Sequence, residues 1–221
     1  MANKLTPNVD RSFNRASHDW YYPYWGPLLL KMNIEESFVN KLMQEGNKAK
    51  SLKQDSRRDL AGELEGQFYY EKPQEWFIPK FLPYWEWYRD MLLDYMAYAS
   101  PEEVPAEIEV GSLWINYQRK MEHQPPHNHS EDFSFVIYLQ VPSEIVIEAE
   151  SMKGKRNNAG PGMVTFYHGP DLKFTRWNYS AMPSVGDLYI FPSHLTHYVN
   201  SFKSDVERIS VSGNFSLIIP K

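Results

Sequence analysis

The chain has 221 residues, and its 28 acidic and 23 basic side chains give a formal net charge of −5. An apolar fraction of 42% and an aromatic fraction of 15% exclude a disordered chain. The net negative charge argues against a protein that binds mainly to nucleic-acid phosphates or anionic membranes. The absence of cysteine excludes disulfide scaffolds, thiolate zinc sites and a cysteine nucleophile. Any chemistry must therefore use nitrogen and oxygen groups.

We expect no export signal at the beginning of the chain. Residues 1–11 are polar and lack the apolar stretch of a signal peptide. The longest early apolar run, Leu28–Leu30, is far too short to cross a bilayer. We therefore expect a cytoplasmic protein.

The first part of the chain, up to residue 105, carries mostly helical patterns. Helices are predicted over residues 33–43, 57–64 and 81–99. In the first of these, Ile34, Phe38 and Leu42 fall on one face at helical spacing. In the third, an apolar stripe includes Trp85. We expect these helices to support the remainder of the chain.

After Pro105 the pattern changes to the alternation of strands, as in Leu113, Ile115 and Tyr117. Strand-like runs cover residues 113–118, 134–141, 145–150, 163–167, 172–178, 187–191 and 208–218. No flexible linker separates the two parts. The sequence therefore predicts one domain over 1–221, with a helical support region at 1–105 packed on a β-domain at 106–221. The expected fold class is mainly β with flanking α, and the β-domain is predicted to be a jelly roll.

The histidines cluster along the β-domain. His127 and His129 lie two residues apart, so on an extended strand they point to the same side and can bind the same metal ion. A third ligand from a distant strand, such as His197, would close a metal site. Histidine nitrogens suit iron, zinc, copper or nickel, and three protein ligands with open positions are typical of a catalytic site. The expected ordinary surface or core histidines are His18, His123 and His168.

Arg208 begins an alternating segment in which Ser210 and Asn214 share its face. In a sandwich a polar face ordinarily meets solvent, which would make Arg208 a surface residue. If the face instead points into a barrel, the guanidinium needs an anionic partner, because burying it unpaired is expensive. A small dicarboxylate beside the metal would supply that partner through a bidentate contact.

The order of His127-x-His129, His197 and Arg208-x-Ser210 resembles the Fe(II)/2-oxoglutarate-dependent oxygenase superfamily. The stretches "PPHNHSEDFSFVIYLQVP" and "GDLYIFPSHLTHYVNSFKSDVERISVSGNF" are similar to oxygenases of that superfamily encoded by marine bacteria and tailed phages. The resemblance covers Leu113 to Phe215. It extends weakly to "DLAGELEGQF" at 59–68, which looks like a helical segment before the barrel. It implies a double-stranded β-helix with the metal at its open end, in the host cytoplasm if the protein is phage-encoded.

For the metal, the resemblance implies His127 as the first histidine and His197 as the distal one. The usual motif of the superfamily is His-x-Asp or His-x-Glu, whereas this chain has His129 at the second position. Three ligand sets therefore compete. The first is His127, His129 and His197, the second replaces His129 with Asp132, and the third reads His129-Ser130-Glu131 as the motif. We favour the three-histidine set, because the similar phage sequences also carry HxH.

For 2-oxoglutarate, the resemblance implies that Arg208 pairs with the far carboxylate and that the hydroxyl of Ser210 assists. Tyr138 occupies the place where prolyl-hydroxylase-like members use a tyrosine for the same carboxylate. Ser134 lies four residues earlier on the same strand face, so both would line the cosubstrate pocket. Core filling is the alternative for Tyr138.

The resemblance implies a dioxygenase of the hydroxylase type that uses Fe(II), 2-oxoglutarate and O2 and releases succinate and CO2. The substrate to be hydroxylated is not indicated. "GDLYIFPSHLTH" also resembles the second cupin motif, so a cupin-type three-histidine metalloprotein is an alternative. A non-catalytic jelly-roll binding or structural module of a phage is another, which the aromatic residues at 20–25 and 84–88 would suit. A zinc hydrolase is a more distant alternative.

The expected partners are 2-oxoglutarate, O2 and an unidentified substrate, without membrane or bulk nucleic acid. A homo-oligomer is compatible with the sequence. A basic, glycine-rich loop at 151–163 contains Lys153, Lys155 and Arg156, which would contact an anionic substrate if the loop reached over the site.

Overall fold

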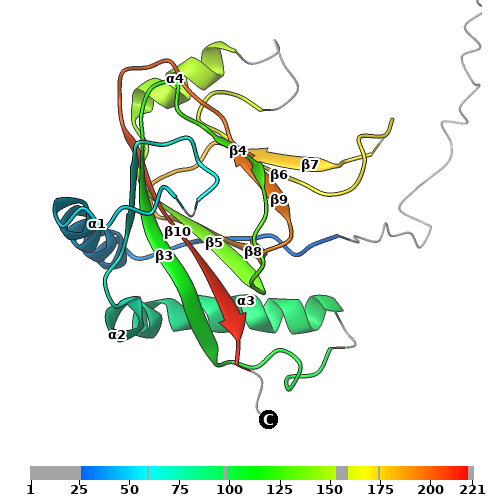
Figure 1. The fold of residues 1–221 in the computed structure, drawn as a ribbon. Coiled ribbons are helices and arrows are strands. Elements are labelled where there is room, and N and C mark those ends of the chain that lie inside the picture. The colour runs from blue at the N-terminus through cyan, green and yellow to red at the C-terminus, as the bar shows by residue number, and fades with distance from the viewer. Residues whose placement is uncertain (1–25, 59, 97–98, 153–158, 174, 219–221) are drawn as a thin grey trace, which may run out of the picture.

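A computed structural model describes residues 26–58, 60–96, 99–152, 159–173 and 175–218. Within these residues, strands form two antiparallel sheets that face each other, and helices cover the outside of the larger sheet (Figure 1). The aromatic residues at 20–25, His18, and the loop residues Lys153, Lys155 and Arg156 lie outside the described residues.

The larger sheet has the strand order β1-β8-β5-β10-β3-β2. The strands are β1 Leu30–Asn33, β2 Gly66–Tyr69, β3 Ile108–Gln118, β5 Phe133–Gln140, β8 Asp187–Pro192 and β10 Arg208–Leu217. β10 pairs with β3 on one side and with β5 on the other. Because β10 has a neighbour on each side, its side chains project from the middle of the sheet on both faces.

The smaller sheet has the order β4-β9-β6-β7. The strands are β4 Gln124–His127, β6 Val164–Tyr167, β7 Asn178–Ala181 and β9 Thr196–Val199. From β3 onward the chain passes back and forth between the sheets, since β3, β5, β8 and β10 belong to the larger one and β4, β6, β7 and β9 to the smaller. These eight strands form the predicted double-stranded β-helix.

The helices are α1 Glu36–Ser51, α2 Pro73–Trp76, α3 Ile78–Met96 and α4 Ser143–Ser151. The first three lie on the outer face of the larger sheet, and α4 lies at one end of the two sheets (Figure 1). The prediction of helices packed on the β-domain is therefore confirmed.

An aromatic core joins the helices to the outer face of the larger sheet. Phe81 of α3 lies 4.6 Å from Phe135 of β5 between ring centroids, and Trp85 lies 5.1 Å from Phe215 of β10. All four side chains are buried. A Cβ atom at Gly213 would lie 2.5 Å from the Phe135 ring, so this close approach of ring and strand requires glycine. The outer face is thus filled by rings that interlock.

The inner face of the same sheet is equally buried and carries polar residues beside apolar ones such as Phe191. It carries Ser134 and Tyr138 of β5, Tyr189 of β8, and Arg208 and Ser210 of β10, all of them less than 5% exposed. The register places Ser210 directly opposite Tyr138, so these two side chains share the inner face. A polar surface enclosed between two sheets is the setting for the site described below.

Three predicted helices had different outcomes. α3 confirms the helix predicted over 81–99 as far as Met96, where the described residues are interrupted. The helix predicted over 33–43 starts later, because Asn33 pairs with Asp187 at the end of β1 and the backbone N–H of Ile34 donates to the carbonyl of Gly186.

The helix predicted over 57–64 was wrong, and so was the helical segment that the resemblance implied at 59–68. The described residues there form turns and isolated bridges, with Glu63 bridged to His123, before β2 begins. The bridge from Glu63 to His123, just before β4, therefore outweighs the local helical pattern.

The strand predicted over 145–150 was also wrong, because this segment is α4. Its run of β-branched residues favours a strand locally, yet only Ile145 of α4 is buried. Glu148 accepts hydrogen bonds from the backbone N–H groups of Lys203 and Ser204 at 3.0 Å, which ties the helix to the chain before β10. The strand predicted over 172–178 begins only at Asn178.

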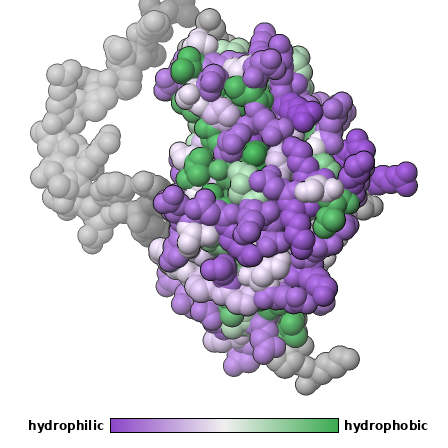
Figure 2. Space-filling view, turned by 90° about the vertical axis from the view of Figure 1, so that its left-hand side faces the viewer, coloured by the Kyte–Doolittle hydropathy of each residue, from purple (hydrophilic) through white to green (hydrophobic). Residues whose placement is uncertain are grey.

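The face seen in Figure 2, on the α1 side of the molecule, is mostly hydrophilic, and its hydrophobic residues form small separate groups. Among the described residues, no helix combines the length and apolar character needed to cross a membrane.

Candidate metal centre

His127 and His197 are direct cross-strand neighbours. His127 is the last residue of β4, and the register places it opposite His197 of β9. Their ring centroids are 4.3 Å apart. β4 tolerates Pro125 and Pro126 because it is the edge strand of the smaller sheet, and a register shift between Gln124 and His127 marks a bulge that turns the end of the strand.

His129 lies in the loop after β4, and Ser193 holds this loop in place. The backbone N–H of His129 donates to the carbonyl of Ser193 at 2.9 Å, and the N–H of Ser193 donates to the carbonyl of Asp132 at 3.1 Å. The buried hydroxyl of Ser193 lies 2.7 Å from that of Ser134. Ser193 was not predicted, because a serine in a turn carries no signal of its own.

The structure brings the three histidines together. One ring nitrogen of each of His127, His129 and His197 lies within 4.8 Å of the others. The ring centroid of His129 is 5.0 Å from that of His127 and 5.4 Å from that of His197. Three nitrogens from two strands and a loop match the donor set of a catalytic site with open coordination positions.

Hydrogen bonds and burial prepare these rings to act as ligands. Nδ1 of His127 lies 2.7 Å from the carbonyl of Pro125, and Nδ1 of His197 lies 2.9 Å from that of Leu195. Each Nδ1–H donates to its carbonyl, which leaves Nε2 available to a metal. Burial, followed by repulsion from neighbouring rings, lowers the pKa of His197 to about 3 and that of His129 to about 4. Burial also lowers the pKa of His127. The rings are therefore neutral at pH 7.

Neither of the two competing carboxylates belongs to the three-histidine group. Asp132 accepts a hydrogen bond from the backbone N–H of Leu217 at 2.8 Å, which anchors the loop to the end of β10. Glu131 lines a neighbouring open cavity. Among the described residues, the group of potential ligand side chains contains only the three histidines.

Arg208 is enclosed between the sheets and is 2% exposed. One terminal nitrogen of its guanidinium donates to the carbonyl of Gly162 at 2.7 Å, while Nε has no partner. Gly162 has a φ of +68°, and a Cβ there would lie 2.3 Å from Ile145 of α4, so glycine is required to present this carbonyl. Among the described residues, no carboxylate forms an ion pair with Arg208. Burial lowers its pKa.

Two tyrosines of the inner face have buried hydroxyls without a hydrogen-bond partner among the described residues. They belong to Tyr138 and Tyr189. The guanidinium carbon lies 5.3 Å from the centroid of the Tyr138 ring, and burial raises the pKa of Tyr138 to about 12. Three orphaned donors in one interior fit an anion, because each would otherwise leave a desolvated group unpaired. Tyr189 was not predicted, although the alternation of "DLYIFP" places it on the face of Phe191.

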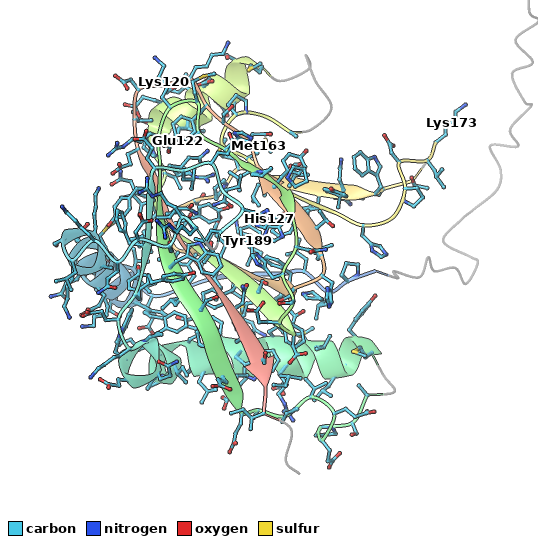
Figure 3. All side chains as sticks on the ribbon, viewed as in Figure 1. Lys120, Glu122, His127, Met163, Lys173 and Tyr189 are labelled. Carbon is cyan, nitrogen blue, oxygen red and sulfur yellow. The ribbon has the colours of Figure 1, made fainter. Side chains whose placement is uncertain are left out.

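The remaining two predicted residues are also buried on the inner face. The hydroxyl of Ser134 is already bonded, to Ser193 and to the side-chain oxygen of Asn214 at 2.8 Å. Ser210 pairs with Tyr138 of β5 on one side and with Asn116 of β3 on the other. A small cavity is lined by the three histidines on one side and by Ser134 and Tyr138 on the other, so the two groups of residues share one interior. In Figure 3, His127 and Tyr189 lie between the sheets.

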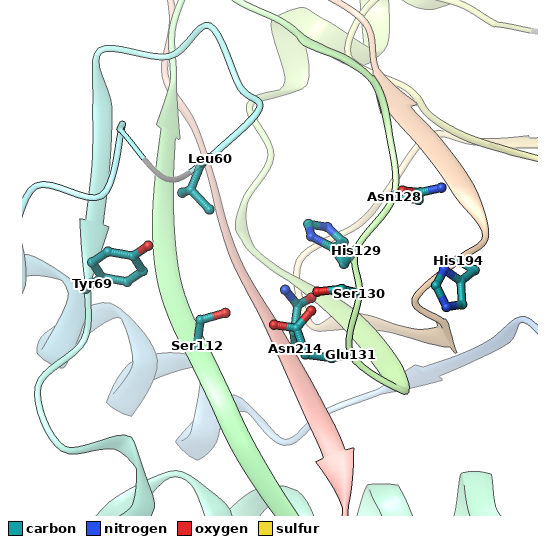
Figure 4. A pocket seen from close by; sticks show the side chains of 9 residues that line it. All are labelled: Leu60, Tyr69, Ser112, Asn128, His129, Ser130, Glu131, His194 and Asn214. Carbon is teal, nitrogen blue, oxygen red and sulfur yellow. The ribbon is translucent and has the colours of Figure 1, made fainter.

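A second, open cavity of about 550 Å³ adjoins His129 on the outside of this interior. Figure 4 shows His129, Glu131 and Ser112 along its wall, with His194 on the opposite side. His194 is exposed and, unlike His197, is not part of the three-histidine group.

The other two described histidines lie outside the centre. His123 bridges to Glu63, with 3.8 Å between its Nδ1 and a carboxylate oxygen, and His168 is exposed in the turn after β6.

Comparison with known proteins agrees with this arrangement. The family described as "Putative 2OG-Fe(II) oxygenase" matches residues 112–214, a stretch that contains the three histidines, Arg208 and both tyrosines. No curated protein sequence matches the chain.

Solved structures share the fold. A prolyl-4-hydroxylase from Pseudomonas putida has a TM-score of 0.54 and 13% sequence identity, with 86% of this chain and 92% of that chain covered. A prolyl hydroxylase from Trichoplax adhaerens, solved in complex with a peptide fragment of the hypoxia-inducible factor oxygen degradation domain, has a TM-score of 0.50 and 12% identity, with 85% and 83% covered. The family match confirms the predicted resemblance at the level of the superfamily, and the solved structures agree with it in fold.

Proposed function

We infer that this chain is a hydroxylase of the 2OG-Fe(II) oxygenase family, which matches its residues 112–214. Fe(II) and 2-oxoglutarate are the cofactor and cosubstrate of this family. When bound, they supply the oxidising power, drawn from O2, that removes hydrogen from a substrate C–H bond, with succinate and CO2 as co-products. The prolyl hydroxylases of the same fold support hydroxylation as the outcome.

His127, His129 and His197 are the proposed metal ligands. Their neutral rings and the fixed Nδ1–H bonds of His127 and His197 present nitrogen donors without first releasing protons. Because the triad carries no negative charge, the metal keeps its full charge, which favours an anionic cosubstrate. Asp132 and Glu131 remain outside the proposed ligand set.

Arg208 is the proposed partner of the carboxylate of 2-oxoglutarate that lies away from the metal. The observation that carries this proposal is the buried guanidinium with an unpaired Nε. A charge held in this way is costly until an anion arrives. The hydroxyls of Tyr138 and Tyr189 would donate to the same carboxylate, and Ser210 lies beside Tyr138 to assist. We place Ser134 at the wall of the shared cavity, where it positions Asn214 and Ser193.

The test is anaerobic titration of the metal-free protein with Fe(II) and 2-oxoglutarate. Wild type should develop the visible charge-transfer absorption of the chelated complex. Arg208→Met should fold, because it removes an unpaired buried charge and keeps the length of the side chain, but its 2-oxoglutarate affinity should fall at least about 100-fold. Arg119→Met is the matched control and should bind 2-oxoglutarate normally. Arg119 is exposed and follows Gln118, which pairs with Arg208 in the register. An unchanged affinity in Arg208→Met would refute the proposed role.

A second candidate is a cupin-type metalloprotein, which the three-histidine set itself favours. In that case the protein would bind metal, but 2-oxoglutarate would produce no charge-transfer absorption. A non-catalytic module would show neither metal binding nor absorption. Cytoplasmic location, phage origin, the single-domain organisation and a homo-oligomer stay predictions.

A further inference from the structure

We propose that the open cavity beside His129 takes a substrate that carries a cationic nitrogen, of the ammonium or guanidinium type found in basic amino acids, and that Glu131 binds this nitrogen. The inference rests on the proposed function, because it places the substrate next to the proposed metal ligand. Three features of the cavity support it, namely its volume, the groups that line it and its charge.

The cavity has room for one long side chain. Its volume is about 550 Å³, and it lies at the surface between the loop after β4 and the inner edge of β3 and β10. His129 is common to this cavity and to the closed interior that the three histidines line. A substrate in the cavity would therefore reach the metal from the side of His129.

The wall of the cavity is polar. Apart from Leu60, it presents hydroxyl, amide, imidazole and carboxylate groups, including those of Tyr69, Ser112 and Asn214 (Figure 4). Such a lining suits a substrate that forms hydrogen bonds and disfavours a lipid or another apolar molecule, because burying these groups unpaired would cost free energy.

Glu131 gives the cavity its charge. Its carboxylate lies against β3, since a Cβ atom at Gly111 would be 3.7 Å from Oε1 of Glu131. Among the described residues, no lysine or arginine lines the cavity, and none forms an ion pair with Glu131. The carboxylate is half-buried and therefore less screened than one in open water. A cationic nitrogen would satisfy it, and an anionic substrate would be repelled.

The arrangement also separates the cation from the metal. Glu131 is two residues beyond His129, so a nitrogen held by Glu131 leaves the adjoining methylene groups of a lysine or arginine side chain near the metal ligand. These C–H bonds are the ones open to hydroxylation. Because the cavity is open to solvent, the basic residue can be either a free amino acid or part of a peptide.

The experiment compares cationic probes with neutral isosteres of the same shape. Nα-acetyl-arginine amide is paired with Nα-acetyl-citrulline amide, and Nα-acetyl-lysine amide with Nα-acetyl-norleucine amide. A blocked nonapeptide with one arginine or lysine among glycines separates a peptide source from a free one. Binding is followed anaerobically, by the shift of the charge-transfer band of the Fe(II)–2-oxoglutarate complex and by calorimetry on the zinc-loaded protein with 2-oxoglutarate.

We expect wild type to bind at least one cationic probe about tenfold or more tightly than its neutral isostere. Glu131→Gln should remove this preference while the affinity for the neutral isostere and the charge-transfer band stay unchanged. Glu109→Gln, which removes an exposed carboxylate of β3, is the matched control and should keep the preference. Tighter binding of the nonapeptide than of the amide would assign the peptide source.

Two results would overturn the inference while leaving the proposed function intact. One is a normal charge-transfer band with no preference for a cationic probe, including the case in which no probe binds. The other is a preference that survives Glu131→Gln. Absence of the charge-transfer band in wild type would instead refute the proposed function, and the inference with it.

Discussion

The two faces of the larger sheet consist of the same strands, yet they differ in how their buried side chains are satisfied. On the outer face, rings such as Phe81, Trp85 and Phe135 fill the space between strands and helices. On the inner face, Arg208 and Tyr189 are equally buried but hold polar atoms without partners. The outer face therefore supplies stability, whereas the inner face keeps unpaired groups for a ligand.

The largest effect should come from the outer face. Phe81→Ala removes a ring that contacts Phe77, Phe135 and Phe215, and it should lower the free energy of unfolding by about 3–5 kcal/mol. Urea denaturation measures the loss. The control on the same helix is Trp87→Ala, which changes an exposed side chain and should cost less than about 0.5 kcal/mol. Equal losses in the two variants would contradict the division between the faces.

On the inner side, His129→Ala should reduce Fe(II) affinity by about 100-fold or more, because it removes one of three ligand nitrogens. Asp132→Asn and Glu131→Gln should keep wild-type affinity, since neither carboxylate belongs to the proposed set. Anaerobic calorimetry with Fe(II) provides the measurement. Normal metal binding in His129→Ala, together with its loss in one of the acid variants, would mean that a carboxylate is the third ligand.

Buried neutral histidines should make the metal-free protein sensitive to acid. His197 has an ordinary pKa of 6.5 in the unfolded chain and about 3 when folded, because it is buried. Between these values the unfolded chain binds the proton and the folded protein does not. The free energy of unfolding should therefore fall as the pH drops below 6.5, by about 1.4 kcal/mol per pH unit from this residue.

Chemical denaturation of the metal-free protein from pH 7 to pH 4 tests this dependence. His197→Asn should flatten the profile, whereas the exposed His168→Asn should leave it unchanged. An identical slope in wild type and His197→Asn would disprove the assignment.

The smallest effects are expected when one tyrosine hydroxyl is removed from each face of the sheet. Tyr189→Phe removes an unpartnered hydroxyl, so stability should be unchanged or slightly raised, while 2-oxoglutarate affinity should fall about three- to tenfold. Tyr117→Phe removes a hydroxyl that bonds to Asn47 at 3.0 Å, so stability should fall by about 1 kcal/mol with no change in affinity. Denaturation curves and 2-oxoglutarate titrations of both variants would show whether the two effects separate.

The local hydrophobic pattern predicted much of the fold. It failed for segments whose conformation depends on contacts with residues far away in the sequence. The alternation in β5 and β10 and the apolar stripe of α3 are strong periodic signals, and these elements formed as predicted. The segment 145–150 became a helix because the bonds of Glu148 to the chain before β10 favour that conformation. The segment 57–64 is not helical, and its Glu63 instead bridges to His123, just before β4. Neither partner can be read from the segment itself.

The sequence by itself determined which residues share a face and in what order the polar groups follow one another. The spacing of His127 and His129, and the alternation that starts at Arg208, are properties of an extended chain. Only the tertiary structure decided that this polar face is enclosed rather than solvated, that β4 and β9 set His127 opposite His197, and that the hydroxyl of Tyr189 is buried without a partner. The physical reason is that a strand has two equivalent sides, and what packs against each side depends on a second sheet formed by distant residues.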